Sequence, residues 1–170
     1  MTRVVLMVIL LLLGGCSAGT GSESSADDPS ETPEASEEPR DLNVERVSSD
    51  PPGQGPRRPQ VIVAPSARDL SGATPTSVPD SGSGAYLAAY WGEKPTGGYS
   101  LAVESARCEG DRVTVRLVLK EPPQDAVVTQ ALTYPYAVAV VRDLDLRGKQ
   151  LSFVDQTGRD LGWPVRLADA

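Results

Sequence analysis

The chain has 170 residues and a formal net charge of −7 at pH 7, from 23 acidic and 16 basic side chains, and it contains no histidine. Without histidine, the usual general base of Ser and Cys triads and the commonest transition-metal ligand are both missing. A nucleic-acid-binding surface needs an excess of basic charge, and this chain has the opposite balance. We therefore expect no histidine-dependent hydrolase and no nucleic-acid partner.

The first sixteen residues have the order of a secretory signal peptide. A basic residue, Arg3, precedes an apolar run at residues 4–13, and Gly14-Gly15-Cys16 follows. The run would give a helix of about 15 Å, roughly half the hydrocarbon thickness of a bilayer, so we do not expect a membrane-spanning helix. The sequence predicts that residues 1–15 are a signal peptide.

Leu13-Gly14-Gly15-Cys16 resembles the bacterial lipobox. This resemblance implies cleavage before Cys16 and lipid attachment to its side chain. Two or three acyl chains hold a protein firmly on a bilayer, whereas a single chain exchanges. We therefore expect a lipoprotein of the bacterial cell envelope, anchored through Cys16 to the outer surface of the cell membrane or to the outer membrane, and not a cytoplasmic protein.

The composition divides the mature chain into two parts. Residues 17–58 carry 10 acidic and 4 basic side chains among many Ser, Pro and Gly residues. Such a segment buries too little apolar surface to offset its ordering entropy, so we interpret residues 16–58 as the lipidated cysteine and a disordered acidic tether. Residues 59–170 are long enough for one modest core and are interpreted as a single domain.

Short apolar runs separated by turn residues indicate an all-β fold for this domain. Residues 112–120 alternate between apolar and polar side chains, with Val113, Val115, Leu117 and Leu119 on one face, and Pro122-Pro123 follow the strand. No segment shows a sustained helical period, so we expect a single small antiparallel sandwich or open barrel. The predicted strands are 60–64, 86–91, 99–107, 112–120, 136–142 and 150–154, with a further short strand at 127–132, a polar loop at 71–84, and a last edge strand or loose tail at 161–170.

One connection between strands is a candidate binding loop. Proline presets the φ angle of a turn, and we expect Gly97 to take the left-handed conformation and Gly98 to leave backbone uncovered. A rigid loop flanked by aromatic rings docks against a partner at low entropic cost, although turn geometry alone favours a simple hairpin connection. The candidate protein-binding residues are Lys94, Pro95, Thr96, Gly97, Gly98 and Tyr99, with Tyr90 and Trp91 nearby.

The remaining chemical groups do not form a recognisable catalytic, metal or cofactor site. Asp143 and Asp145 lie two residues apart, which allows a cation site, but a solvated strand face or turn is the more usual arrangement. Cys108 is the only cysteine besides Cys16, and we interpret it as a small, half-buried strand residue, with a reactive thiol or an intermolecular disulfide bridge as the alternative. We expect no enzyme activity, no metal ion and no cofactor.

Three features together resemble the C-terminal domain of PrcB-family proteins. They are the segment Trp91-Gly92-Glu93-Lys94-Pro95-Thr96-Gly97-Gly98-Tyr99-Ser100, the strand that ends in Glu121-Pro122-Pro123, and Thr133-Tyr134-Pro135-Tyr136 before an apolar strand. The resemblance covers residues 85–154. It implies a non-catalytic accessory or stabilising subunit of an extracytoplasmic protein complex in which a separate chain is the protease.

Two alternatives remain open. Pro95-Thr96-Gly97-Gly98-Tyr99 is similar to the Pro-Thr-Thr-Gly-aromatic loop of chagasin-type inhibitors of cysteine proteases, and Gly162-Trp163-Pro164 is a scrambled form of another inhibitor loop. The glycine-rich loop that those inhibitors also use is missing here. The other alternative is a structural envelope protein without a discrete partner.

Overall fold

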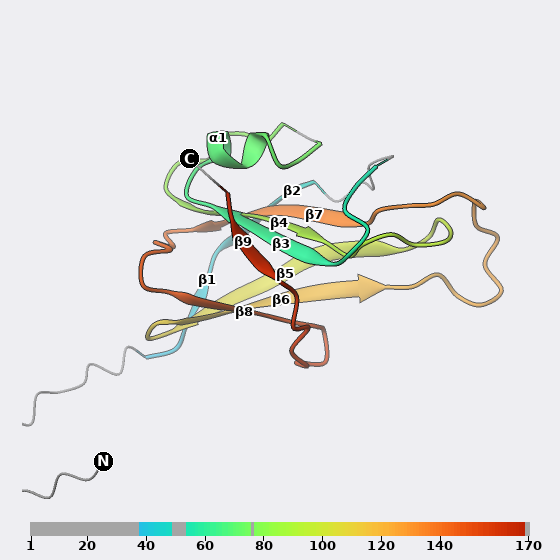
Figure 1. Cartoon of the computed structure of the whole chain (residues 1–170). Helices are drawn as coiled ribbons and strands as arrows, with labels where there is room; N and C mark the ends of the chain where they lie inside the picture. The colour runs from blue at the N-terminus through green and yellow to red at the C-terminus, as the bar shows by residue number, and fades with distance from the viewer. Residues whose placement is uncertain (1–37, 49–53, 76, 169–170) are drawn as a thin grey trace, which may run out of the picture. The chain divides into compact units, whose positions relative to one another are not determined.

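The computed structural model describes residues 38–48, 54–75 and 77–168. The predicted signal peptide, Cys16 and residues 17–37 of the predicted tether lie outside these ranges. Within them, the chain forms two facing β-sheets and one short helix (Figure 1). None of the described helices has the length and apolar character needed to cross a bilayer.

The two sheets contain four and five strands, and the predicted all-β sandwich is confirmed. Five of the seven pairs of neighbouring strands in the described residues are antiparallel. Arg112–Lys120 with Gln150–Val154 and Gln60–Ala64 with Val165–Leu167 run parallel, and the sheets do not close into a barrel. The four-stranded sheet has the order β1 (Arg40–Leu42), β5 (Ser100–Glu109), β6 (Arg112–Lys120), β8 (Gln150–Val154). The five-stranded sheet has the order β2 (Val44–Ser48), β7 (Tyr136–Arg142), β4 (Gly84–Tyr90), β3 (Gln60–Ala64), β9 (Val165–Leu167).

The main core lies between the sheets and is built from alternate residues of each strand, because successive side chains of a strand point to opposite faces. The four-stranded sheet contributes Val113, Val115 and Leu117, as its alternation predicts, and leaves its other face to solvent. The opposite sheet contributes a matching set of small and β-branched side chains: Val61, Val63, Ala85, Leu87, Ala89, Ala137, Ala139 and Val141.

The five-stranded sheet is buried on its outer face as well. The helix α1 (Ala67–Ser71) packs there through Leu70, against Tyr86 and Val140. This second core explains why β4 and β7 are apolar without alternation, as sheets covered on both faces generally are. Ser66 caps α1 by accepting a hydrogen bond from the Asp69 backbone N–H at 3.3 Å. The helix has five residues, too few for a periodic apolar pattern, and the sequence did not predict it.

Strands β1 and β2 correct the predicted boundary of the tether, which placed residues 16–58 outside the folded domain. Asn43 alone separates them, so the chain passes directly from one sheet to the other. β1 pairs with β5, β2 pairs with β7, and Leu42 and Val44 pack against the main core. Their stability comes from this long-range pairing, which the polar composition of the segment does not reveal.

The predicted strand at 127–132 is wrong, because these residues lie in the connection between β6 and β7 and form no ladder. Val127 is fully exposed to solvent, with a relative accessibility of 103%. A β-branched sequence becomes a strand only where a partner strand and a buried face are available. Residues 127–132 have neither.

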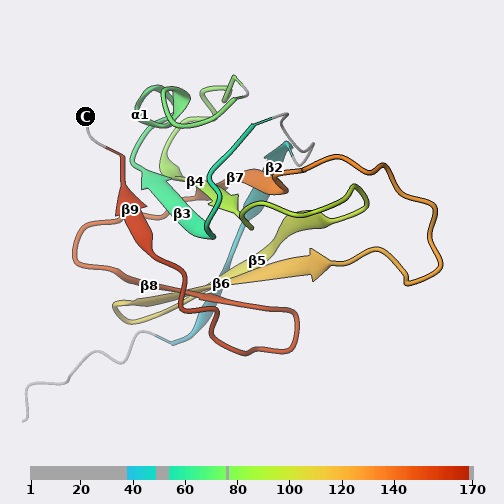
Figure 2. The ribbon, with the colours of Figure 1, turned by 45° about the vertical axis from the view of Figure 1, so that its right-hand side comes forward.

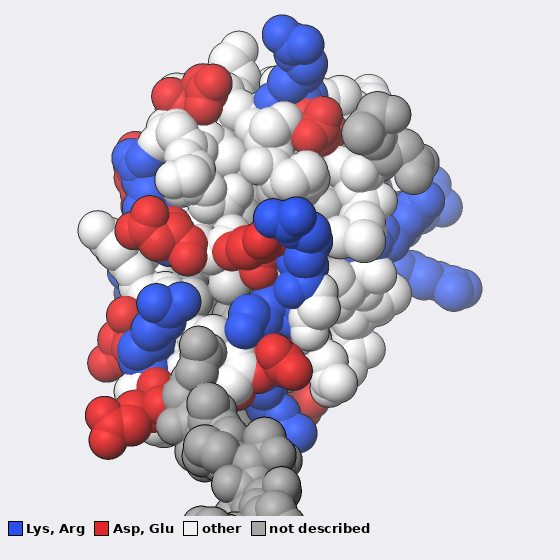
Figure 3. All heavy atoms as spheres, turned by 90° about the vertical axis from the view of Figure 1, so that its left-hand side faces the viewer, with Lys and Arg blue, Asp and Glu red and all other residues white. Residues whose placement is uncertain are grey.

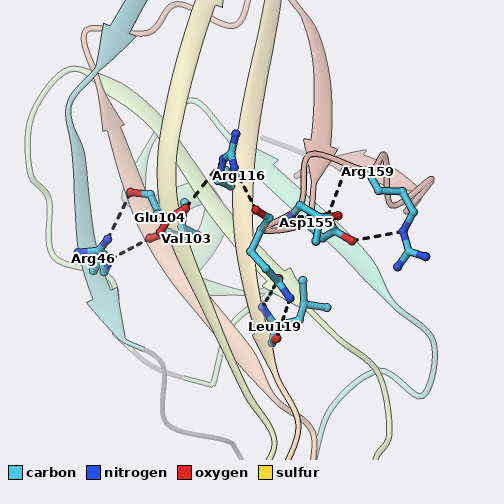
Figure 4. Close-up of polar contacts among 9 residues, drawn as sticks. Arg46, Val103, Glu104, Arg116, Leu119, Asp155 and Arg159 are labelled. Carbon is cyan, nitrogen blue, oxygen red and sulfur yellow. Dashed lines mark hydrogen bonds and ion pairs between the residues drawn. The ribbon is translucent and has the colours of Figure 1, made fainter.

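A β-bulge in β5 changes which side chains face the core. The partner register passes from Val103 to Ser105 while β6 advances by one residue, so Glu104 is the extra residue. As a result Leu101 and Val103 are buried before the bulge, and Ala106 and Cys108 after it. Arg46 of β2 reaches the bulge from the other sheet and donates to the carbonyl oxygens of Val103 at 2.7 Å and Glu104 at 3.3 Å (Figure 4).

Candidate partner-binding site

The β4–β5 loop (residues 91–99) and the β6–β7 loop (residues 121–135) extend side by side from the same end of the sandwich (Figures 1 and 2). Lys94 and Thr133 exchange two backbone hydrogen bonds of 2.8 and 3.0 Å. The Gly97 N–H donates to the Thr129 carbonyl at 3.0 Å, and the Thr133 hydroxyl donates to the Thr96 carbonyl at 2.7 Å. These bonds make the paired loops one preformed surface.

Side-chain contacts fix the base of the paired loops. The Tyr134 hydroxyl donates to the Glu93 carboxylate at 2.8 Å, and this bond is the main reason why the pKa of Tyr134 is raised. Arg57 lies 3.5 Å from the same carboxylate. A backbone hydrogen bond adds to these contacts: the main-chain N–H of Trp91 donates to the Pro135 carbonyl at 2.9 Å. The two loops are therefore joined along their length rather than at a single point.

Lys94, Trp91 and Tyr99 form a compact cluster in the β4–β5 loop. The two rings meet edge to face, with centroids 5.6 Å apart and an interplanar angle of 76°. The Lys94 ammonium lies 4.1 Å from the Trp91 centroid and 5.5 Å from that of Tyr99. Such a cation–π contact holds the ammonium against the rings. Burial lowers the pKa of Lys94, and the negative charge of Glu121 acts in the opposite direction.

The two glycines of the loop lie close to the neighbouring loop, and Gly98 is exposed to solvent, as expected. A Cβ atom on Gly97 would lie 2.4 Å from the Thr129 hydroxyl, and one on Gly98 would lie 2.8 Å from the Cβ of Pro122. The left-handed residue is Gly98, with φ of +86°, and not Gly97 as predicted. The glycines therefore let the β6–β7 loop approach closely.

Tyr90 does not belong to this surface. It is buried in the second core, where its ring stacks on Tyr136 with centroids 5.8 Å apart and its hydroxyl donates to the Ala73 carbonyl at 2.6 Å. Burial, with a smaller contribution from Tyr136, raises the pKa of Tyr90 to about 12. The even-numbered residues of β4 face the helix, so Tyr90 and the loop cluster are on different sides of the sheet.

The paired loops expose large apolar side chains to solvent among their polar ones. Pro95 is exposed in the first loop, and Val127 and Leu132 are exposed in the second, the latter with a relative accessibility of 58%. Isolated exposed apolar residues are common, but two large ones on one preformed loop favour an interaction surface. The β6–β7 loop was not predicted as part of the site; its signals in the sequence are the Pro122-Pro123 pair and its length.

A cleft of about 570 Å³ lies next to the paired loops. Trp91 lines it together with Trp163, which belongs to the segment compared above with an inhibitor loop, and with Leu119 and Glu121. The turn after β8 closes its other side and is fixed by Gln156, whose side-chain amide pairs with the backbone N–H and carbonyl of Leu119 at 3.1 and 3.3 Å (Figure 4).

The carboxylate of Asp155, which lines the cleft, is occupied by structural bonds. One oxygen of Asp155 accepts from the backbone N–H and hydroxyl of Thr157, at 2.8 and 2.5 Å, and from the Arg159 N–H at 3.1 Å. The other oxygen lies 3.2 Å from the Arg159 guanidinium. The Thr157 hydroxyl is the main reason why the pKa of Asp155 is lowered. The carboxylate therefore stabilises the turn.

The candidate cation-site residues Asp143 and Asp145, and the thiol of Cys108, lie outside the paired loops. Asp145 pairs with Arg147 at 2.8 Å, which lowers its pKa, and Asp143 occupies the same loop after β7. Cys108 is a free, fully buried thiol of the main core, more buried than predicted. Over the described ranges, no three His, Cys, Asp or Glu side chains are grouped so that they could hold a metal ion.

The surface formed by the described residues has no net charge. Acidic and basic side chains are equal in number over the described residues, so the net charge of −7 arises from residues outside them. On the face shown in Figure 3, basic and acidic side chains alternate without a patch of one sign. Recognition at the paired loops would therefore depend on shape and apolar contact.

These features define a class: a two-sheet β-sandwich domain with a preformed double-loop surface at one end. Residues 85–142, from the start of β4 to the end of β7 with both loops, match the family model described as PrcB C-terminal. This match confirms, over residues 85–142, the resemblance predicted from the sequence. No curated protein and no solved structure matches the chain.

The family match indicates a general kind of function. It associates this domain with protease complexes in a general way, and the domain is of the accessory-subunit type and not a known catalytic family. The matched segment contains both paired loops, whereas β1, β2, β3, α1, β8 and β9 lie outside it.

Proposed function

We propose that the protein is a lipid-anchored, non-catalytic subunit of an extracytoplasmic protease complex and that it binds its partner through the paired loops. The family match supports the class of partner. The order of residues 1–16, with Gly14-Gly15-Cys16 after an apolar run, supports secretion and anchoring. The tether then holds the domain at a distance from the membrane.

One observation carries the binding part of the proposal: the paired loops present exposed apolar side chains on a backbone fixed by hydrogen bonds and close packing. Preorganisation of this kind reduces the ordering cost of association. A simple hairpin connection between β4 and β5 would not need a second loop joined to it by Lys94, Thr129 and Thr133.

The test is crosslinking in native membranes followed by capture of the protein and an assay for co-purified proteolytic activity. The informative change is Val127→Asp with Leu132→Asp, because both side chains are exposed and their substitution leaves the core intact. Desolvating two carboxylates in an apolar contact is costly, so the variant should lose most of the captured protease.

The matched control is Ser105→Asp, which adds a carboxylate at an exposed position in the middle of β5. It should capture the protease as the parent chain does. Equal capture by the double variant and the parent would remove the paired loops from the proposal. Recovery of no protease with any form, parent included, would refute the subunit assignment.

Anchoring is tested separately. Replacement of Cys16 by Ser should abolish incorporation of labelled palmitate and move the protein from the membrane fraction to the soluble extracytoplasmic fraction. Retention of label in this variant would show that another residue carries the lipid.

Protease inhibition is a second candidate, favoured by one specific observation: Trp163 and the β4–β5 loop border the same end of the domain, where Trp91 and Trp163 line one cleft. An inhibitor of the chagasin type should block papain at a stoichiometric ratio. Titration of papain with the full chain distinguishes the two functions, since an accessory subunit leaves papain activity unchanged.

A further inference from the structure

Strand β9 is an exposed edge of the five-stranded sheet (Figure 2). All three of its residues are exposed, and Val165 and Leu167 keep 41% and 67% of their surface accessible. Proteins generally protect such edges with charges, prolines or a covering loop, because unpaired backbone groups accept further strands. Within β9 only Arg166 is charged, so this edge can accept a further strand.

The register of β9 against β3 shows which backbone groups are unused by the sheet. The Val61 N–H donates to the Pro164 carbonyl at 2.9 Å, and the Ala168 N–H donates to the Val63 carbonyl at 2.8 Å. In a parallel ladder, the backbone N–H and carbonyl groups of every second residue point to the same neighbouring strand. The backbone of Arg166 therefore also bonds to β3. The N–H and carbonyl groups of Val165 and Leu167 therefore point away from the sheet.

The side chains of the same two residues extend an apolar surface. Val165 and Leu167 are in register with Val61 and Val63, which face the main core. They continue that face beyond the part that the four-stranded sheet covers. A groove of about 980 Å³ adjoins it; its lining is mainly apolar, with Leu167, Leu144, Leu146 and Pro65, and also includes Asp143, Asp145 and Arg147. The edge thus offers a strand position with an apolar pocket at one end.

The tether of the predicted mature chain does not supply a suitable occupant. Residues 17–37 contain no large apolar side chain, so the tether cannot fill the groove. A second copy can pair β9 with β9 over its full length only by placing Arg166 directly opposite Arg166, and like charges directly opposite one another are destabilising. Shifted registers use fewer of the outward backbone groups.

We propose that β9 receives an extended segment of a different protein as an additional strand, and that this segment has the pattern apolar–acidic–apolar. The two apolar residues lie opposite Val165 and Leu167, with one side chain entering the groove, and the acidic residue lies opposite Arg166. Main-chain hydrogen bonds and alternate side-chain pockets together define strand addition. This site is distinct from the paired loops and goes beyond the proposed function.

The test uses the full chain and a defined probe, the peptide acetyl-Thr-Val-Glu-Leu-Thr-amide, with amide hydrogen exchange followed by NMR. Binding should slow exchange at Val165 and Leu167, whose N–H groups point outward, and leave Arg166 and Ala168 unchanged because they already bond to β3. Unchanged exchange at Val165 and Leu167 at saturating peptide overturns the proposal. Slowed exchange of these amides without peptide, together with dimer formation, would assign the edge to a second copy instead.

Two controls test the chemistry. A peptide with lysine in place of glutamate should bind about tenfold more weakly, because it places a cation opposite Arg166. Leu167→Lys should abolish binding, since a charge on this face blocks strand addition, and the domain should fold because Leu167 is already exposed. The Val127 and Leu132 double variant should bind the peptide normally. Loss of peptide binding and loss of protease capture are thus separable, and failure of one leaves the other standing.

Discussion

Gly98 combines a left-handed backbone with a close approach by a neighbouring loop. We expect Gly98→Ala to lower the free energy of unfolding by about 1–3 kcal/mol, because a Cβ atom is strained at φ of +86° and would meet Pro122. Gly110→Ala is the matched control: its φ is +54°, but a Cβ atom there has open space. Urea unfolding should show the larger loss for Gly98. Equal losses would mean that the contact between the loops adds nothing.

Tyr90 makes stability depend on pH in the alkaline range. Its pKa is about 12 in the folded domain and about 10 in an unfolded chain, so the unfolded state releases the phenolic proton first as the pH rises. The stabilisation is complete below pH 10 and is lost progressively between pH 10 and pH 12. Urea midpoints of the parent should therefore fall more between pH 9 and pH 11.5 than those of Tyr90→Phe.

Tyr90→Phe also has an expected cost at neutral pH. It removes the hydrogen bond to the Ala73 carbonyl and should lower stability by about 1 kcal/mol. A parallel decline of parent and variant with rising pH would contradict the assignment of the alkaline loss to this hydroxyl.

At the scale of elements, the bulge in β5 and strand β2 depend on each other through Arg46. Arg46→Met keeps the aliphatic part of the side chain but leaves two carbonyl oxygens without the guanidinium, and we expect a loss of about 1–3 kcal/mol. Arg107→Met, which breaks an exposed pair with Asp41, should cost less than about 1 kcal/mol. Chemical denaturation of both variants measures the difference, and a ranking in the reverse order would show that Arg46 does not support the bulge.

The strands that could be predicted from sequence are those with a local signal. Alternation or continuous β-branched runs set the bounds of β3, β6, β7 and β8, which agree with the prediction residue for residue. β1 and β2 have no such signal, because partners more than fifty residues away along the chain hold them. The bulge at Glu104 also has no local signature, and it reversed the alternation expected for the second half of β5.

The candidate site was predictable only within one loop. Sequence reasoning identified Trp91, Lys94 and Tyr99, which the structure brings together. It could not identify the β6–β7 loop as their partner, because contact between two loops depends on which strands are neighbours. It also included Tyr90, since adjacent residues in a strand appear close in sequence but point to opposite faces.

At the scale of the whole molecule, the N-terminal boundary of the folded domain is a testable feature. A chain that begins at Glu38 should unfold with the same midpoint as the full chain, whereas one that begins at Pro59 lacks β1 and β2 and exposes the edges of β5 and β7. We expect the shorter form to be less stable and to aggregate, because both sheets gain unprotected edges. Thermal unfolding and size-exclusion chromatography distinguish the forms. Equal behaviour would show that residues 40–48 add nothing to the fold.

The passage of the chain from β1 to β2 also determines how the domain would respond to mechanical load. A pull on the N-terminal segment enters at Arg40, opposite Cys108, and must detach the three residue pairs of β1 from β5 before it reaches Asn43. Beyond Asn43, the force acts on β2 and so on the other sheet, where Arg46 joins it to the β5 bulge. Under force applied from this end, the sandwich would therefore unfold in two steps: β1 would detach from β5 first, and the core would be exposed only afterwards.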